Sequence, residues 1–349
     1  MAVVHVPRVT SLRLTSHPSA PWRLASQSKR EVSMSVGQQQ HPAGEMSPSM
    51  PTRLLGRTGH QVGLFSLGGQ GVIEQANSEA MAIAVVRRAL DLGVNYIDTA
   101  PRYTAGARES ERHIGHALRG DRQRVFLATK THDRSRDGSL KLLDESLELL
   151  QTDHVDLWQM HNIQFQEEID QVFAAGGALE ALLQARADGR TRFLGLTGHF
   201  DPAPLLEGLR RFDFDCILMA LNAADPHCAS FAARLLPTAV AKQMGIIAMK
   251  VPAHGRILST WTPPPLVEQN PWAEADRPGT ITMQEALHYV WTLPVSTAIV
   301  GCDHPDHVQE NVEAARCFVP LSTQHMRQIE AHTAPIARQA LFFRNWAGA

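Results

Sequence analysis

Four residues whose side chains can take part in proton transfer stand at or near the ends of successive apolar segments of this sequence. Asp98 ends VNYID, Lys130 ends VFLATK, His161 ends VDLWQMH, and Tyr103 follows Asp98 by five residues. A phenol has a pKa of about 10 and donates poorly near neutrality unless a neighbouring charge stabilises the phenolate. An ammonium group supplies such a charge, and a carboxylate keeps the ammonium charged. We therefore expect Lys130 to lower the pKa of Tyr103 and Asp98 to pair with Lys130.

These side chains together fit the reduction of a carbonyl group. Tyr103 would give its proton to the developing alkoxide beside a hydride donor, and His161 would hydrogen-bond and orient the same oxygen. Each residue alone also has an ordinary structural explanation. Asp98 could cap the turn before Pro101, and Lys130 could be a solvated strand end. Their joint occurrence at consecutive segment ends favours chemistry over chance.

The elements that must position these residues are short apolar segments separated by amphipathic ones, at a spacing of roughly 30 residues that is typical of βαβ units. Eight such units closing on themselves make a (β/α)8 barrel, in which strand ends share one mouth. The alternative is an open doubly wound sheet, but SLGGQG (66–71) matches its glycine-rich fingerprint poorly. The eight expected strands are 64–68, 94–98, 125–130, 155–161, 192–198, 215–221, 245–250 and 296–301.

Three further segments frame the expected barrel. Residues 52–63 suit a β-hairpin that closes the barrel bottom, and residues 321–349 suit a helical tail. The long, proline-rich segment 251–280 follows the seventh strand, where a lid is expected. In the helix that follows the first strand, Ser78 is the expected N-cap. Residues 51–349 are thus interpreted as one domain.

Composition limits the class of protein. The chain has 349 residues, 44% of them hydrophobic and 19% charged, with a net charge of −2. These values predict a packed globular protein and give no reason to expect a nucleic acid or a membrane as partner. The four cysteines show no CxxC spacing and are expected to be reduced. The sequence carries no signal for an oligomeric state.

The first 50 residues differ from the rest of the chain. They hold five basic and two acidic residues among many Ser, Thr, Gln and Pro residues. That composition suits an organelle transit peptide, a disordered tail or a mis-assigned start, with Met50 just before the ordered pattern. We favour the tail or the mis-assigned start over targeting, and expect a cytoplasmic protein.

Three stretches carry a resemblance to a known family. YIDTAPRY, FLATKT and DLWQMHN resemble the signature regions of the aldo-keto reductases, and the similarity extends from about Thr52 to Asn311. Members of this family are NAD(P)H-dependent (β/α)8-barrel oxidoreductases that convert an aldehyde or ketone to an alcohol. The resemblance implies that Tyr103 is the general acid and base and that Lys130 lowers its pKa. It also implies that Asp98 pairs with Lys130 and that His161 orients the carbonyl.

The resemblance also implies where a nicotinamide cofactor would bind. The residues it implies are Gly69, Thr197, Asn222, Lys250, Gly301, Cys302, Asp303, His307, Glu310 and Asn311. The pattern departs from the family in several places. Gly198 stands where the family has an amide side chain that binds the nicotinamide. The segment AMKVPAHG replaces the Ser-Pro-Leu pattern that is usual after the seventh strand, and Lys250 in this segment would reach the pyrophosphate.

The choice between the two cofactors depends on the residues after the last strand. His307 occupies the position of a family arginine that favours NADP(H), and Asp303 would repel a 2′-phosphate but accept from a ribose hydroxyl. Asp303 could equally cap the next helix. NADP(H) is slightly favoured on family habit, with NAD(H) as the alternative.

The predicted substrate is a small carbonyl or alcohol compound, with Arg102, Trp158, Asn162 and Trp261 lining its pocket. No HxH, HExxH or paired Cys/His spacing indicates a metal site, so none is expected. The alternative to an enzyme is a nicotinamide-binding regulatory or sensor barrel with little turnover. The complete set of four catalytic residues favours the enzyme.

Overall fold

The computed structural model describes residues 49–259 and 278–347. The N-terminal extension, the proline-rich part of the expected lid and Trp261 lie outside these residues. Eight parallel strands close into a barrel in the order β10-β3-β4-β5-β6-β7-β8-β9, which confirms the predicted (β/α)8 fold. The strands are β3 (Phe65–Gly71), β4 (Tyr96–Asp98), β5 (Phe126–Thr131), β6 (Val155–Met160), β7 (Thr191–Gly198), β8 (Cys216–Ala220), β9 (Gly245–Met249) and β10 (Thr297–Cys302).

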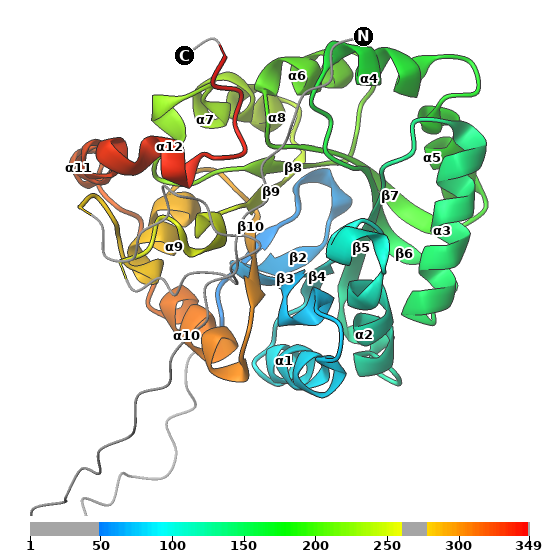
Figure 1. The fold of residues 1–349 in the computed structure, drawn as a ribbon, viewed down its shortest axis with the longest axis horizontal. Coiled ribbons are helices and arrows are strands. Elements are labelled where there is room, and N and C mark those ends of the chain that lie inside the picture. The colour runs from blue at the N-terminus through cyan, green and yellow to red at the C-terminus, as the bar shows by residue number, and fades with distance from the viewer. Residues whose placement is uncertain (1–48, 260–277, 348–349) are drawn as a thin grey trace, which may run out of the picture. The chain divides into compact units, whose positions relative to one another are not determined.

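Helices surround the barrel on its outer side (Figure 1). They are α1 (Glu79–Asp91), α2 (Glu109–Ala117), α3 (Arg136–Leu150), α4 (Gln166–Phe173), α5 (Ala178–Ala187), α6 (Pro202–Arg211), α7 (Phe231–Arg234), α8 (Leu236–Ala241), α9 (Met283–Thr292), α10 (Pro305–Arg316), α11 (Thr323–Thr333) and α12 (Ala337–Ala340). Ser78 directly precedes α1, but its hydroxyl donates to the carbonyls of Val72 and Gln75 and makes no cap bond. No helix among the described residues is long and apolar enough to cross a membrane.

The pleat of the strands divides the apolar side chains between two cores. One fills the barrel and includes Tyr96, Phe126 and Leu157. The other lies between the barrel and its helices and includes Trp158 and Leu143. Because successive residues of a strand point to opposite faces, Leu157 and Trp158 belong to different cores. This parity decides which strand residues can reach the mouth.

A hairpin precedes the barrel, as predicted. Strands β1 (Thr52–Leu54) and β2 (Gln61–Gly63) pair antiparallel. Leu55 and Val62 are fully buried in the core inside the barrel. Gly56 has a φ of +48°, and a Cβ there would lie 2.2 Å from the backbone nitrogen of Gly245. The hairpin therefore lies against the start of β9, at the end of the barrel opposite the mouth.

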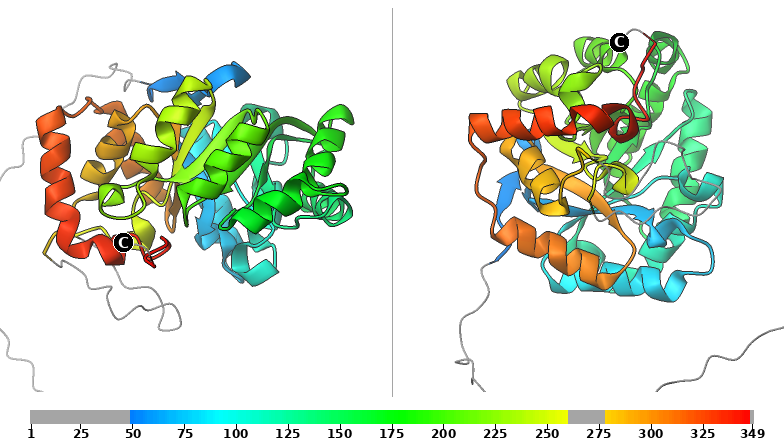
Figure 2. Two further views of the ribbon diagram at one scale, coloured as in Figure 1. Left: turned by 90° about the horizontal axis from the view of Figure 1, so that it is seen from above. Right: turned by 60° about the vertical axis from the view of Figure 1, so that its left-hand side comes forward.

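The C-terminal segment packs against the later part of the barrel. In both views of Figure 2, α11 (red) lies beside α9, where the Tyr289 hydroxyl donates to Glu330 over 2.8 Å. Beyond α12 the chain returns to the loop after β7, where the amide of Asn345 donates to the carbonyl of Phe200 over 2.9 Å. The predicted helical tail is thus attached to the barrel by hydrogen bonds.

Candidate active site

The ammonium group of Lys130 contacts two of the other predicted residues, Asp98 and Tyr103, at the carboxyl ends of the strands. It donates to the carboxylate of Asp98, to the carbonyl of Thr99 over 2.7 Å and to the hydroxyl of Tyr103 over 3.3 Å. Lys130 and Asp98 are 1% and 0% exposed. Asp98 ends β4, Lys130 lies in β5 beside it, and Tyr103 begins a 3₁₀ turn just after β4. The pattern of strand ends therefore places these groups in mutual contact.

Gln159 completes the surroundings of Asp98 and was missed by the sequence prediction. Its amide nitrogen donates to the second carboxylate oxygen of Asp98 over 3.2 Å. Gln159 lies opposite Lys130 in the parallel register of β5 and β6 and faces inward. A Cβ at Gly195 of β7 would lie 2.7 Å from the Cγ of Gln159, so only glycine leaves room there for this side chain. The parity of β6 was the signal that could have identified Gln159.

His161 lies across from the phenol. The two rings of His161 and Tyr103 are 6.1 Å apart and nearly perpendicular, at 81°. The backbone amide of His161 donates to the carbonyl of Thr131 over 2.8 Å, and its own carbonyl accepts from Arg134 over 2.9 Å. Its Nδ1 atom is buried and has no hydrogen-bond partner among the described residues. The backbone thus fixes an imidazole that retains hydrogen-bonding capacity.

Burial controls the protonation of these groups. Burial, together with the charge of Lys130, holds the pKa of His161 well below its ordinary value, so the imidazole is neutral at neutral pH. Burial raises the pKa of Tyr103 well above its ordinary value, and the carboxylates of Asp98 and Glu74 add to this effect. Burial also raises the pKa of Asp98 and lowers that of Lys130.

The direction for Tyr103 differs from the expectation that Lys130 lowers its pKa. The reason is that a phenolate at this position would be buried and would lie beside the carboxylate of Asp98, and both effects raise the pKa. They outweigh the stabilising effect of the Lys130 ammonium, which also bonds Asp98 and Thr99. Tyr103 therefore keeps its proton at neutral pH. A group in that state can act as an acid toward a developing alkoxide.

A second charged group, Lys250, lies at the end of β9. Its ammonium donates to Oε1 of Gln70 over 3.1 Å and to Nε2 of His254 over 2.9 Å. Because β9, β10 and β3 are consecutive in the barrel, a contact from Lys250 to Gln70 of β3 crosses the end of β10. Burial lowers the pKa of Lys250 to about 8, and Lys250 in turn is the main cause that lowers the pKa of His254 to about 3. The cation therefore contacts two neutral groups.

The backbone around Lys250 is strained. Lys250, Ala253 and His254 have φ angles of +60°, +49° and +55°, in the left-handed region that residues with a Cβ rarely adopt. Such conformations cluster at functional sites and persist only where the surroundings hold them. A partly exposed ammonium on a strained segment at the mouth fits the diphosphate of a dinucleotide cofactor.

Of the residues that follow β10, one caps the helix α10 and another keeps its side chain free to contact a ligand. His304, rather than Asp303, is the N-cap of α10, and its Nδ1 accepts from the amide of Asp306 over 3.2 Å. Asp303 is exposed, and its carboxylate makes no hydrogen bond within residues 49–259 and 278–347. A Cβ at Gly71 would lie 2.9 Å from this carboxylate. His307 accepts from the amide of Asp303 over 3.4 Å. The carboxylate of Asp303 thus fits a ribose hydroxyl.

Three of the residues that the sequence assigned to the cofactor use their polar groups inside the protein. The hydroxyl of Thr197 accepts from the amide of Asn162 over 2.8 Å. Asn311 is buried and donates to the sulfur of Cys302 over 3.5 Å, and burial raises the pKa of that thiol to about 12. The amide of Asn222 bonds only backbone groups. These residues shape the mouth from within.

The glycines and Glu310 complete the predicted cofactor set. A Cβ at Gly69 would lie 2.4 Å from the hydroxyl of Ser110, and one at Gly301 would lie 2.8 Å from the carbonyl of Gln70. Both glycines therefore serve the close packing of the chain around them. Glu310 is exposed on α10. Lys250, Asp303 and Glu310 are the predicted residues whose charged groups remain suited to a ligand.

Some of the predicted substrate residues are buried within the protein, and others keep polar groups that could contact a ligand. Trp158 was predicted wrongly, because it is fully buried between the barrel and its helices and faces away from the mouth. Asn162 follows β6 with a φ of +52°, and its amide oxygen is buried without a partner among the described residues. Arg102 is exposed beside Tyr103.

Arg102 lines a cavity of about 500 Å³ between the loop after β4 and α3, and Tyr103, Lys130 and His161 are not among its lining residues. The other lining residues are Pro101, Gly106, Arg108, His132, Leu142 and Glu145. Arg108 is engaged by Glu111 and Glu145, whereas Arg102 has no partner in the described part of the chain. Burial, together with Arg102, lowers the pKa of His132, whose buried Nδ1 has no described partner. His132 was missed by the sequence prediction, although it follows Lys130 by two residues.

The described residues contain no group of three or more His, Cys, Asp or Glu side chains that could hold a metal ion.

Comparison with known proteins agrees with this geometry. The model of the aldo/keto reductase family matches residues 61–334. The chain is 30% identical over 313 residues to L-galactose dehydrogenase of Arabidopsis thaliana, covering 81% of this chain and 94% of that protein. Aldo-keto reductase AKR11C1 from Bacillus halodurans superposes with a TM-score of 0.65 at 25% identity, covering 81% of this chain and 96% of that one. An aldo-keto reductase from Klebsiella pneumoniae, solved in complex with NADPH, gives a TM-score of 0.63 at 22% identity, covering 82% and 96%.

The same family is indicated by the three signature regions, by the closed barrel and by these matches. The chain belongs to the aldo/keto reductase family of oxidoreductases, as the resemblance in its sequence predicted.

Proposed function

We propose that this protein interconverts an aldehyde or ketone and the corresponding alcohol with a nicotinamide cofactor, and that Tyr103 is its general acid. The observation that carries the proposal is the buried ammonium of Lys130, which bonds both Asp98 and the Tyr103 hydroxyl at the mouth. If Lys130 and Asp98 formed an ion pair that only stabilised the fold, the pair would not require the Tyr103 hydroxyl as a third partner.

The residues of the chain divide the work of the reaction. A bound nicotinamide supplies the hydride. Tyr103 holds its proton at neutral pH and donates it to the oxygen that becomes an alkoxide. Lys130 stabilises the resulting phenolate, since its ammonium lies 3.3 Å from the hydroxyl. Neutral His161 donates a hydrogen bond to the same oxygen and orients it.

The protonation state of Tyr103 bears on the direction of the reaction. A protonated phenol serves the reduction of a carbonyl, whereas oxidation of an alcohol needs the phenolate as base. Reduction is therefore the favoured direction near neutral pH, and oxidation should gain as the pH rises.

For the cofactor, Lys250 would contact the diphosphate and Asp303 a ribose hydroxyl. NADP(H) is the first choice, because the family relative from Klebsiella pneumoniae was solved with NADPH. The exposed carboxylate of Asp303 opposes a 2′-phosphate and makes NAD(H) the alternative. Because His304 caps α10, the carboxylate of Asp303 remains available for this discrimination.

For the substrate, we propose a small polyhydroxylated carbonyl compound. The relative named L-galactose dehydrogenase acts on a sugar by its name. Arg102 and His132 stand next to Tyr103 and close to Lys130 in the sequence, and the Nδ1 atom of His132 has no described partner, which suits a hydroxyl of such a molecule.

The test is to mix purified protein with NADPH or NADH and a panel of aldoses, simple aldehydes and ketones, and to follow cofactor oxidation. The proposal predicts turnover of at least one hydroxylated aldehyde. Saturable cofactor binding without turnover of any compound would instead support the sensor alternative.

A further inference from the structure

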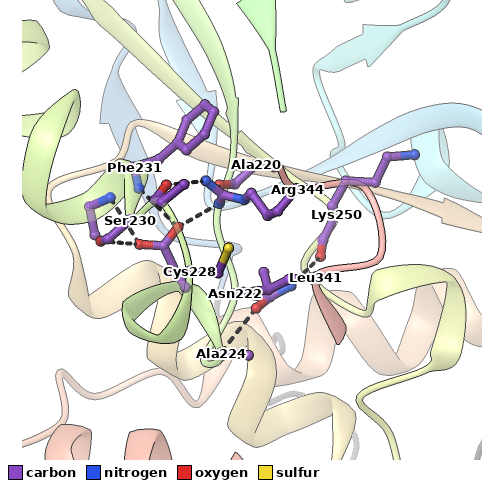
Figure 3. Close-up of polar contacts among 12 residues, drawn as sticks. Ala220, Asn222, Ala224, Cys228, Ser230, Phe231, Lys250, Leu341 and Arg344 are labelled. Atoms are coloured by element: carbon purple, nitrogen blue, oxygen red, sulfur yellow. Dashed lines mark hydrogen bonds and ion pairs between the residues drawn. The ribbon is translucent and has the colours of Figure 1, made fainter. Parts of the chain in front are cut away.

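Asn222, which follows β8, connects the mouth of the barrel to the C-terminal tail. Its amide nitrogen donates to the carbonyl of Lys250 and to the carbonyl of Ala340, both over 3.2 Å. Its amide oxygen accepts from the backbone of Ala224 over 3.0 Å. The side chain is 1% exposed, and both of its donor hydrogens are used (Figure 3). One buried amide therefore joins three segments that are distant in the sequence.

Lys250 is the partner for which this amide matters most. Its left-handed φ of +60° is unfavourable for a residue with a Cβ and needs support from its surroundings. The carbonyl of Lys250 accepts from Asn222 and from the amide of Ala253, over 3.2 and 3.0 Å. The side chain of Asn222 therefore holds the backbone of Lys250 in place, and from this backbone the Lys250 side chain extends toward Gln70.

The tail that provides Ala340 is anchored four residues later by Arg344. Its guanidinium donates to the carbonyls of Ala229 and Ala220, both over 2.8 Å, and to the carboxylate of Asp225 over 2.5 Å. Arg344 and Asp225 have fully buried side chains. Figure 3 shows the tail returning to β8 at this point, beside Asn222. The tail is thus held against the strand after which Asn222 lies.

A second contact leads from the tail to the side chain of Lys250. The ring of Phe342 lies 5.5 Å from that of His254, whose Nε2 accepts from the ammonium of Lys250. The tail therefore contacts Lys250 at its backbone through Asn222 and at its ammonium through His254.

From these contacts we infer that Asn222 is a positioning residue that couples the docking of the C-terminal tail to cofactor affinity through Lys250. The inference rests on the proposed function, in which Lys250 contacts the cofactor diphosphate. Coupling between two sites is reciprocal, so a cofactor that uses Lys250 must also stabilise the docked tail.

The first experiment is a double-mutant cycle on cofactor binding. The dissociation constant for NADPH, or for NADH where that binds more tightly, is measured by fluorescence for the wild type, Asn222→Ala, Lys250→Met and the double variant. Asn222→Ala should raise the dissociation constant about tenfold, the effect of one lost hydrogen bond. In the Lys250→Met background it should change the constant by less than about twofold.

Asn95→Ala is the matched control. The amide of Asn95 also bonds two backbone groups, the amide of Gly63 and the carbonyl of Gln61, but at the hairpin end of the barrel. This variant should lower Tm without changing the dissociation constant. An Asn222→Ala variant that behaves like the control would overturn the inference, as would equal effects of Asn222→Ala in both backgrounds.

The second experiment needs no variant and keeps the inference testable if Asn222→Ala does not fold. Amide hydrogen exchange of residues 337–346 in the wild type should slow at least threefold when the cofactor is saturating. Unchanged exchange would refute the coupling while leaving the proposed function intact. A wild type that binds neither cofactor would refute the proposed function and the inference with it.

Discussion

Replacing Arg344 by methionine is expected to destabilise the protein by about 3 kcal/mol. Breaking a buried ion pair by removing one partner costs ~3–5 kcal/mol, because the remaining charge stays buried without compensation. Here that charge is the carboxylate of Asp225, which keeps three hydrogen bonds, from the Ser230 hydroxyl and the amides of Phe231 and Ala232. These bonds place the expected cost at the lower end of the range.

The assay is urea denaturation followed by circular dichroism, with the change in the free energy of unfolding taken from the shift of the midpoint. Adding Asp225→Asn should recover part of the loss, since it removes the unpaired charge and keeps one acceptor oxygen for the Ser230 hydroxyl and the amide of Ala232. Arg210→Met is the control. The side chain of Arg210 is 72% exposed where it pairs with Glu207, and exposed pairs contribute ~0–1 kcal/mol. A loss below about 1 kcal/mol for Arg344→Met, or no recovery in the double variant, would show that the tail is not held by this pair.

Four further results are expected at the mouth. Tyr103→Phe should lower kcat about 10²–10⁴-fold, the contribution of a general acid, with little change in cofactor affinity in a fluorescence titration; retained turnover would exclude the role. Because the pKa of Lys250 is about 8 and its ammonium is charged below that value, the dissociation constant for the cofactor should rise as the pH passes 8, and a Lys250→Met variant should show no such rise. Asp303→Ser should raise the preference for NADPH over NADH by roughly tenfold, the effect of removing one like charge, measured as the ratio of kcat/KM values. Arg102→Gln should raise KM for a hydroxylated aldehyde by about fivefold with kcat nearly unchanged, whereas an equal effect on an unsubstituted aldehyde would point to a structural role.

The strand ends could be predicted because buried strands have short, nearly continuous apolar runs and because a barrel collects their carboxyl ends. This reasoning was sufficient to bring Asp98, Lys130 and Tyr103 together. It failed at Trp158, where one residue of parity decides whether a side chain enters the mouth or the layer of helices. The same parity would have pointed to Gln159.

The cofactor side was harder to predict for a different reason. An amide such as that of Asn222 bonds the carbonyl of Ala340, and no pattern in the sequence signals a pair separated by 118 residues. The choice between Asp303 and His304 as the cap of α10 depends on backbone geometry at neighbouring residues, and either side chain can cap. Polar residues near a mouth therefore look alike in sequence, whether they face a ligand or the backbone.

The glycine at position 195 has a consequence for how mutations in this protein would be interpreted. Any side chain there collides with Gln159 and displaces the amide that bonds the second oxygen of Asp98. A random-mutagenesis screen for activity should therefore recover position 195, although it carries no functional group and lies on the strand next to Gln159. Such a substitution would act by filling the space that Gln159 occupies. The lost activity would then come from the displacement of Gln159, a residue that the mutation leaves unchanged.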